Sequence, residues 1–187
     1  MAKVKLNPIL EGVRGKVGDL VFKSYNDEVL IARKPDQSSI EPSSAQIAQR
    51  ERFSQAVLYG KTVMADPETK AIYEAAARRK GKPVFSLTVA DFFKAPSVDL
   101  VDLGNYAGAP GDEIHIRASD DFAVSRVMVA ISDADGNAIE SGEASQALGE
   151  WVYTATEAVS AGTVVRILVT AVDRPGGTGE REQEVTI

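Results

Sequence analysis

The chain has 187 residues, of which 44% are hydrophobic and 26% charged, and its formal net charge is −6. This composition predicts a folded globular protein, and the acidic balance argues against nucleic-acid binding by the chain as a whole. The absence of cysteine excludes disulfides, thiolate zinc sites and a cysteine nucleophile, and His115 is the one histidine. No apolar run is long enough for a Sec signal or a membrane span, so we expect synthesis in the cytoplasm without membrane insertion, and a virion or extracellular location only after release.

Charge divides the chain near Pro96. Residues 1–95 carry a net charge of +5, and residues 96–187 carry −11. The pattern of secondary structure changes at the same place. We therefore predict an α+β protein of two modules, in which a hairpin arm (1–35) and a helical segment (36–95) precede an all-β sandwich (96–187).

The N-terminal arm is predicted to contain a β-hairpin over residues 19–34. Its two strands flank a turn at Asn26 and Asp27, and Pro35 ends it. Glycines at 12, 15 and 18 are expected to allow tight turns. Both faces of the hairpin carry apolar residues, so it must pack on its own helices or on another protein. The candidate assembly residues are Leu20, Phe22, Tyr25, Val29, Ile31, Arg33 and Lys34.

Helices are expected after the linker at 36–42. Ser43 and Gln46 form a capping box for a helix that ends near Ala65. Its predicted apolar stripe consists of Ile47, Phe53, Val57, Leu58 and Met64.

The second helix is predicted over 67–80, between an Asp66 cap and Gly81. Ile72, Tyr73 and Ala76 should face inward. A short helix or turn at 86–95 should bring Phe92 and Phe93 into a core at the junction of the modules. The stretch around the second helix's end is the most basic in the chain, and its cations are either solvated helix-capping charges or contacts for an acidic partner or nucleic acid. These residues are Arg78, Arg79, Lys80 and Lys82.

The C-terminal half alternates short apolar strands with turns, as in a β-sandwich. Ile114 and Ile116 should face the core opposite His115, and Trp151 and Tyr153 should anchor it. Seven strands are predicted, at 98–103, 112–118, 124–132, 138–143, 151–156, 163–172 and 180–187.

Three segments of this half resemble the bacterial immunoglobulin-like repeats. They are ASDDFAV at 118–124, VMVAI at 127–131 and AVDRPGG at 171–177, where Gly177 replaces the asparagine that usually ends the last motif. The resemblance covers residues 98–187 and implies a binding, spacing or structural module rather than a catalyst. More loosely, the Gly-rich start and Arg33-Lys34-Pro35 resemble uncharacterised bacterial and prophage proteins, from which no activity can be transferred.

Two groups of aspartates invite a calcium interpretation. Counted from Asp133, an EF-hand loop would need glycine and glutamate where Ala138 and Ala144 stand, so that segment is predicted to be only a hairpin turn. The loops after the second and sixth strands can lie at one end of a sandwich. Their aspartates either bind Ca²⁺ through hard oxygen ligands or form turns, and they are Asp120, Asp121 and Asp173.

No motif indicates catalysis, because His115 alternates outward on a strand and no nucleophile elbow is present. The leading hypothesis is a structural or assembly protein that anchors through its basic half and displays the acidic sandwich, such as a phage-type virion accessory, fibre or surface component, with self-association as the expected interaction. One alternative is a soluble glycan- or protein-binding module with a calcium site. The other is a nucleic-acid-associated protein that uses Lys61 and the basic stretch.

Overall fold

The computed structural model describes residues 2–4, 14–25, 28–34 and 41–187. Contacts between residues divide the chain into two compact units, residues 1–47 and 48–187. We expected the helical segment to form one module with the hairpin, whereas this division groups residues 48–95 with the sandwich. The boundary at residue 96 stays a prediction. The α+β class with a sandwich-like β part is confirmed.

The first unit contains a four-stranded antiparallel sheet in the order β1-β4-β3-β2. The predicted hairpin corresponds to β3 (Leu20–Tyr25) and β4 (Glu28–Arg33), which pair over their whole lengths, while the expected turn at 26–27 lies outside the described residues. The sequence did not reveal β1 (Ala2–Val4) and β2 (Gly15–Val17), which add a strand on each side. Gly18, with φ of 59°, makes the tight turn into β3; Gly12 lies outside the described residues.

Three helices follow, and their ends agree closely with the sequence signals. Helix α1 (Ser44–Ala65) begins with the predicted capping box, in which Ser43 and Gln46 exchange hydrogen bonds of 3.1 and 3.3 Å. Helix α2 (Pro67–Lys80) is capped by Asp66 and ends at Gly81 in the left-handed conformation. Helix α3 runs over Val84–Phe93, slightly earlier than predicted. No helix in the described ranges is both long and apolar enough to cross a bilayer.

The predicted apolar stripe of α1 is not the face that this helix buries. Ala56, Gly60 and Val63 are buried instead, whereas Phe53, Leu58 and Met64 are exposed. The reason is the close approach of α3, because a Cβ atom on Gly60 would lie 2.8 Å from Thr88 Oγ1. Small residues permit that approach and leave the larger ones outside.

The inward face of α2 is predicted correctly in part. Tyr73 and Ala76 are buried with Val63 and Leu87, but Ile72 is exposed. Phe92 and Phe93 are only half-buried, so these two side chains are not the fully buried core residues that we expected.

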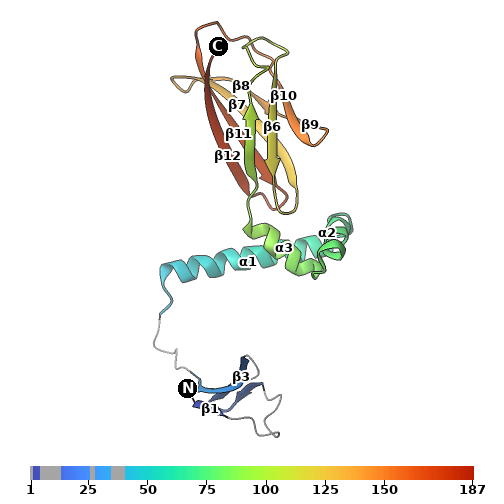
Figure 1. Ribbon diagram of the computed structural model, residues 1–187, viewed down its shortest axis with the longest axis vertical. Coiled ribbons are helices and arrows are strands. Elements are labelled where there is room, and N and C mark those ends of the chain that lie inside the picture. The colour runs from blue at the N-terminus through green and yellow to red at the C-terminus, as the bar shows by residue number, and fades with distance from the viewer. Residues whose placement is uncertain (1, 5–13, 26–27, 35–40) are drawn as a thin grey trace. The chain divides into compact units, whose positions relative to one another are not determined.

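Eight strands build the rest of the second unit as two four-stranded antiparallel sheets, in the orders β5-β6-β10-β9 and β12-β11-β7-β8 (Figure 1). Their bounds match the seven predicted strands closely, and β9 is the additional one. The first sheet comprises β5 (Ser97–Asp102), β6 (Glu113–Ser119), β9 (Ser145–Ala147) and β10 (Glu150–Thr154). The second comprises β7 (Val124–Asp133), β8 (Ala138–Glu143), β11 (Val164–Asp173) and β12 (Thr178–Thr186).

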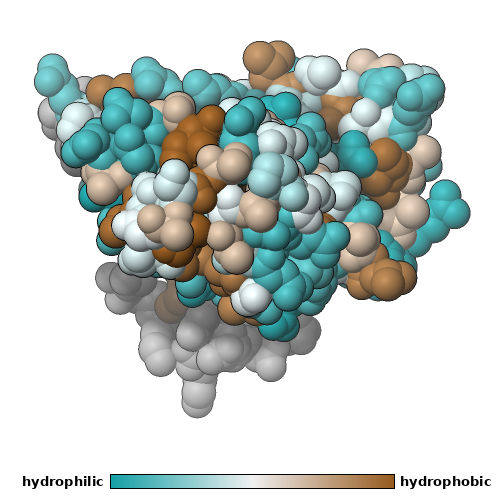
Figure 2. Space-filling view, turned by 90° about the horizontal axis from the view of Figure 1, so that it is seen from above, coloured by the Kyte–Doolittle hydropathy of each residue, from teal (hydrophilic) through white to brown (hydrophobic). Residues whose placement is uncertain are grey.

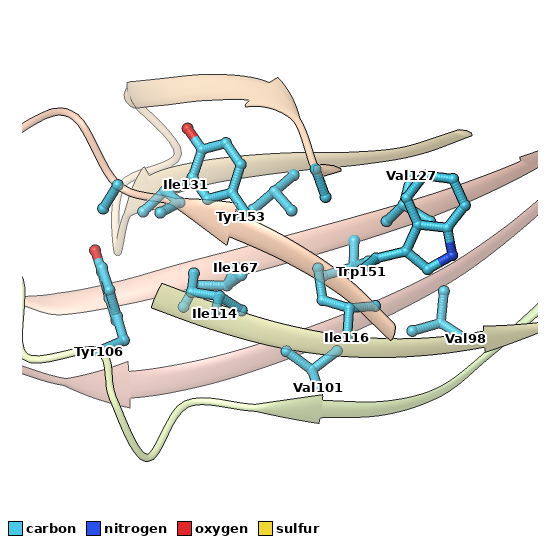
Figure 3. Close-up of a cluster of buried hydrophobic side chains, with 14 of the residues drawn as sticks. Val98, Val101, Tyr106, Ile114, Ile116, Val127, Ile131, Trp151, Tyr153 and Ile167 are labelled. Carbon is cyan, nitrogen blue, oxygen red and sulfur yellow. The ribbon is translucent and has the colours of Figure 1, made fainter. Parts of the chain in front are cut away.

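The core of these sheets confirms the predicted alternation of inward and outward residues. Ile114 and Ile116 of β6 are fully buried, whereas His115 between them is partly exposed. Trp151 and Tyr153 come from β10, and Figure 3 shows them beside residues of both sheets. Apolar burial of this kind is the main source of sandwich stability.

Candidate functional site

A chain of hydroxyl and carboxyl groups joins the helices at the end of the sandwich. Tyr73 on α2 is fully buried and donates its hydroxyl hydrogen to Asp91 Oδ2 on α3. The Tyr59 hydroxyl lies 2.7 Å from the Tyr73 hydroxyl. Since Tyr73 has only one hydroxyl hydrogen, Tyr59 acts as the donor to Tyr73. The Tyr73 ring stacks on Phe122 of the β6–β7 loop, with centroids 4.2 Å apart.

Asp120 and Asp121, in the same β6–β7 loop, lie beside Asp91. One carboxylate oxygen from each of the three residues lies within 4.8 Å of the others. Asp91 is 1% exposed, while the two loop aspartates are half-buried. We call Asp91, Asp120 and Asp121 the aspartate cluster.

The pKa of Asp91 is raised to about 6. Burial of the carboxyl is the largest cause, and the negative charges of Asp120, Asp173 and Asp121 add to it, against the hydrogen bond from Tyr73. Burial likewise raises the pKa of Tyr59 and of Tyr73.

Two lysines from the helical segment reach the same loop. Lys94 Nζ lies 3.3 Å from Asp121 Oδ2, and Lys80 Nζ donates a 2.6 Å hydrogen bond to the Asp121 carbonyl oxygen. Together with the Tyr73–Phe122 stack, these contacts fix the helices to the sandwich. They concern only residues of the second compact unit.

The predicted calcium residues are brought together only in part. Asp120 and Asp121 do meet, but the third member of the cluster is Asp91, which the sequence analysis missed. Asp173 stands outside the group, although its charge helps to raise the pKa of Asp91. Its own pKa is raised by burial, and its Oδ1 accepts a 2.5 Å hydrogen bond from Gly177 N.

A signal for Asp91 does exist in the sequence. It is a single acidic residue within the apolar run of α3, VFSLTVADFF. A charged residue in such a run is seldom buried without a specific partner. The partner Tyr73 lies eighteen residues away in the chain, and periodicity cannot identify such a pair.

A groove of about 660 Å³ lies between the first two helices and the ends of β7 and β11. Tyr59, Arg126, Asp173 and Arg174 are among its lining residues. Aromatic, cationic and anionic groups therefore converge on one recess.

The predicted basic patch has a partly structural role. Arg78, Arg79, Lys80 and Lys82 are all exposed, as expected for solvated cations. Arg78 lies 3.8 Å from Glu74 on the preceding turn, and Lys80 is engaged with the β6–β7 loop. A nucleic-acid function for these residues stays a prediction.

The predicted assembly residues of the arm lie on β3, on β4 and just after β4. Leu20, Arg33 and Lys34 are exposed, and Phe22 and Ile31 are half-buried. The side chains of Tyr25 and Val29 lie outside the described parts of the structure. A partner-binding role for this set stays a prediction.

Large apolar side chains are exposed along α1. The exposed fractions are 53% for Phe53, 66% for Leu58 and 38% for Met64. On the face that Figure 2 draws, hydrophobic residues form separate groups among hydrophilic ones. On α1, Phe53 and Met64 lie on the same side of the helix, and Leu58 lies about 140° round the helix from Phe53.

The remaining candidates behave as the sequence predicted. Asp133 Oδ1 accepts hydrogen bonds from Asp135 N and Asn137 N, as in a hairpin turn. His115 is partly exposed on β6, where its ring nitrogens lie 3.4 and 3.7 Å from carboxylate oxygens of Glu113 and Glu150.

Comparisons with known proteins give little information about function. No family model and no curated protein matches the chain. The crystal structure of the Br derivative of BhCBM56 is 17% identical, and the match covers 41% of this chain and 78% of that one with a TM-score of 0.33. Ruminococcus gnavus beta-glucuronidase is 16% identical, with 50% of this chain and 15% of that one covered and a TM-score of 0.30. Neither likeness is close enough to support an argument.

Proposed function

We propose that this protein is a non-enzymatic structural component that self-associates through α1 and displays an immunoglobulin-like sandwich. The observation that carries the proposal is the exposed surface of α1. We define the α1 face by six residues on one broad side of the helix, of which Val57 is half-buried and the others are exposed, namely Arg50, Phe53, Val57, Leu58, Lys61 and Met64.

The composition of the α1 face is unusual for a helix surface in water. Such surfaces are normally polar, since each exposed apolar side chain forgoes the free energy of burial. Here apolar side chains surround two cations. Burial against a partner would recover that free energy while the cations select the partner's charge.

Charge complementarity favours a second copy of the chain as the partner. The sandwich half carries −11, and β12 places Glu180, Glu182 and Glu184 on one of its faces, all exposed. Glu184 is paired with Arg166 at 2.7 Å, which leaves Glu180 and Glu182 as the carboxylates that we assign to the α1 cations of another copy. A head-to-tail contact of this kind repeats along a fibre or closes into a ring.

The strand order supports the immunoglobulin-like part of the proposal. The eight strands of the sandwich can be numbered along the chain from β5. Across one sheet they then lie in the order first, second, sixth and fifth, and across the other in the order eighth, seventh, third and fourth. This order is similar to the ABED and GFC arrangement of immunoglobulin-type sandwiches with one extra edge strand. Such modules serve as spacers and displayed domains, which suits a fibre, a surface assembly or a phage-type virion. The binding-module and nucleic-acid alternatives stay predictions.

Self-association is tested by sedimentation velocity on the full-length protein over a range of concentrations. We expect oligomers that grow with concentration and weaken at high salt, since charged contacts are screened. The double variant Leu58→Ser/Met64→Ser should remain monomeric, whereas the control Leu148→Ser, which changes an exposed leucine of the sandwich, should associate like the wild type. A monomeric wild type, or equal association of all three proteins, would contradict the proposal.

A further inference from the structure

The aspartate cluster connects two elements that are distant in the sequence. Asp91 belongs to α3, and Asp120 and Asp121 belong to the β6–β7 loop, yet their carboxylate oxygens lie within 4.8 Å of one another. Carboxylates at this separation repel one another strongly when they are ionised. A cluster of this kind needs either protons or cations to be stable.

A second observation concerns the individual oxygens. Each carboxylate uses its Oδ2 for a contact within the protein: Asp91 accepts from Tyr73, Asp120 accepts from Phe122 N and Ala123 N at 2.9 Å, and Asp121 lies beside Lys94. The Oδ1 of each is buried and has no hydrogen-bond partner among the described residues. Asp91, at 1% exposure, is thus a buried side chain with one oxygen unpartnered.

An unpartnered buried carboxylate oxygen is costly, and three of them at one place are unusual in a folded protein. The structural contacts of the Oδ2 atoms hold all three carboxylates in place. Within the described ranges, Lys94 is the cation that forms an ion pair with the cluster. Its single charge does not balance three carboxylates, and Asp173 adds further negative charge nearby.

We propose that Asp91, Asp120 and Asp121 bind a divalent cation, calcium in preference to magnesium, which ties α3 to the β6–β7 loop of the sandwich. Calcium takes oxygen ligands at 2.3–2.6 Å, so two ligands of one ion can be about 5 Å apart. Magnesium demands a near-ideal octahedron and gives up its bound water reluctantly, so it suits a site of three protein carboxylates less well than calcium does. Water molecules complete the coordination, because the two loop aspartates are only half-buried.

The test uses full-length protein freed of metal with a chelator and then given CaCl₂ alone. Thermal unfolding should shift upward by about 5–10 °C at a calcium concentration one hundred times the Kd. MgCl₂ at the same concentration should shift it less. Isothermal titration should show one calcium per chain.

Variants separate a cluster site from general binding of calcium to an acidic protein. Asp91→Asn should abolish the calcium-dependent shift, while the metal-free protein unfolds at the same or a higher temperature because one repelling charge is gone. If Asp91→Asn fails to fold, Asp121→Asn in the loop should give the same loss. The control Asp135→Asn removes one exposed carboxylate from the β7–β8 turn and should keep the full shift. No shift in the wild type, or an equal shift in all variants, would overturn the proposal.

Discussion

Replacing Tyr73 with alanine is expected to lower the free energy of unfolding by about 3–5 kcal/mol, the usual cost of removing a buried aromatic ring. The side chain is fully buried, and its ring stacks on Phe122 with centroids 4.2 Å apart. Its loss creates a cavity where the helices meet the sandwich. It also removes the hydroxyl that bonds to Asp91 and Tyr59. Urea denaturation followed by circular dichroism measures the change.

Tyr73→Phe serves as the matched variant for this prediction. It keeps the ring and its stack but removes the hydroxyl, so the Asp91 carboxylate loses its buried donor. We expect a loss of about 1–3 kcal/mol, the typical penalty for an unsatisfied buried polar group. If alanine cost no more than phenylalanine, packing of the Tyr73 ring would not stabilise the junction.

Replacing Trp151 with alanine is expected to destabilise the sandwich by about 3–5 kcal/mol. Trp151 lies on β10 and pairs in register with Ile116 of β6, and its side chain packs in the core that both sheets share (Figure 3). No neighbouring side chain can fill the space of an indole ring without rearrangement. The same denaturation experiment, read from β-sheet signal, gives the change.

Val164→Ala is the control for Trp151→Ala. Val164 begins β11 and is exposed, so its truncation should change the free energy of unfolding by less than about 0.5 kcal/mol. Equal effects of the two substitutions would contradict the assignment of Trp151 to the core.

The sequence predicted those features that are determined by neighbouring residues. Capping residues such as Ser43 and Asp66 act on backbone groups within one turn, so they locate the helix ends closely. Strand alternation, as at Ile114 and Ile116, reports which side of a strand is buried. The seven strands predicted for the sandwich were therefore nearly complete, and within the sandwich only the three-residue β9 was missed.

The failures arose where distant residues decide the outcome. The apolar stripe of α1 suggested burial, but the helix turns Gly60 toward α3, and only the folded arrangement shows that a small residue is needed there. Asp91 was missed because its partners, Tyr73 and the β6–β7 loop, are remote in the chain. Strands β1 and β2 are short, with little room for an alternating pattern.

We propose that α1 of one copy contacts the acidic sandwich of another. Mixed-isotope cross-linking tests it most directly: equal amounts of unlabelled and heavy-isotope-labelled full-length protein are treated with a carbodiimide, which joins amines to carboxylates in contact. We expect peptides that link Lys61 to Glu180 or Glu182 and carry one labelled and one unlabelled half. Mixed-isotope links that avoid Lys61, or links confined to single copies, would contradict it.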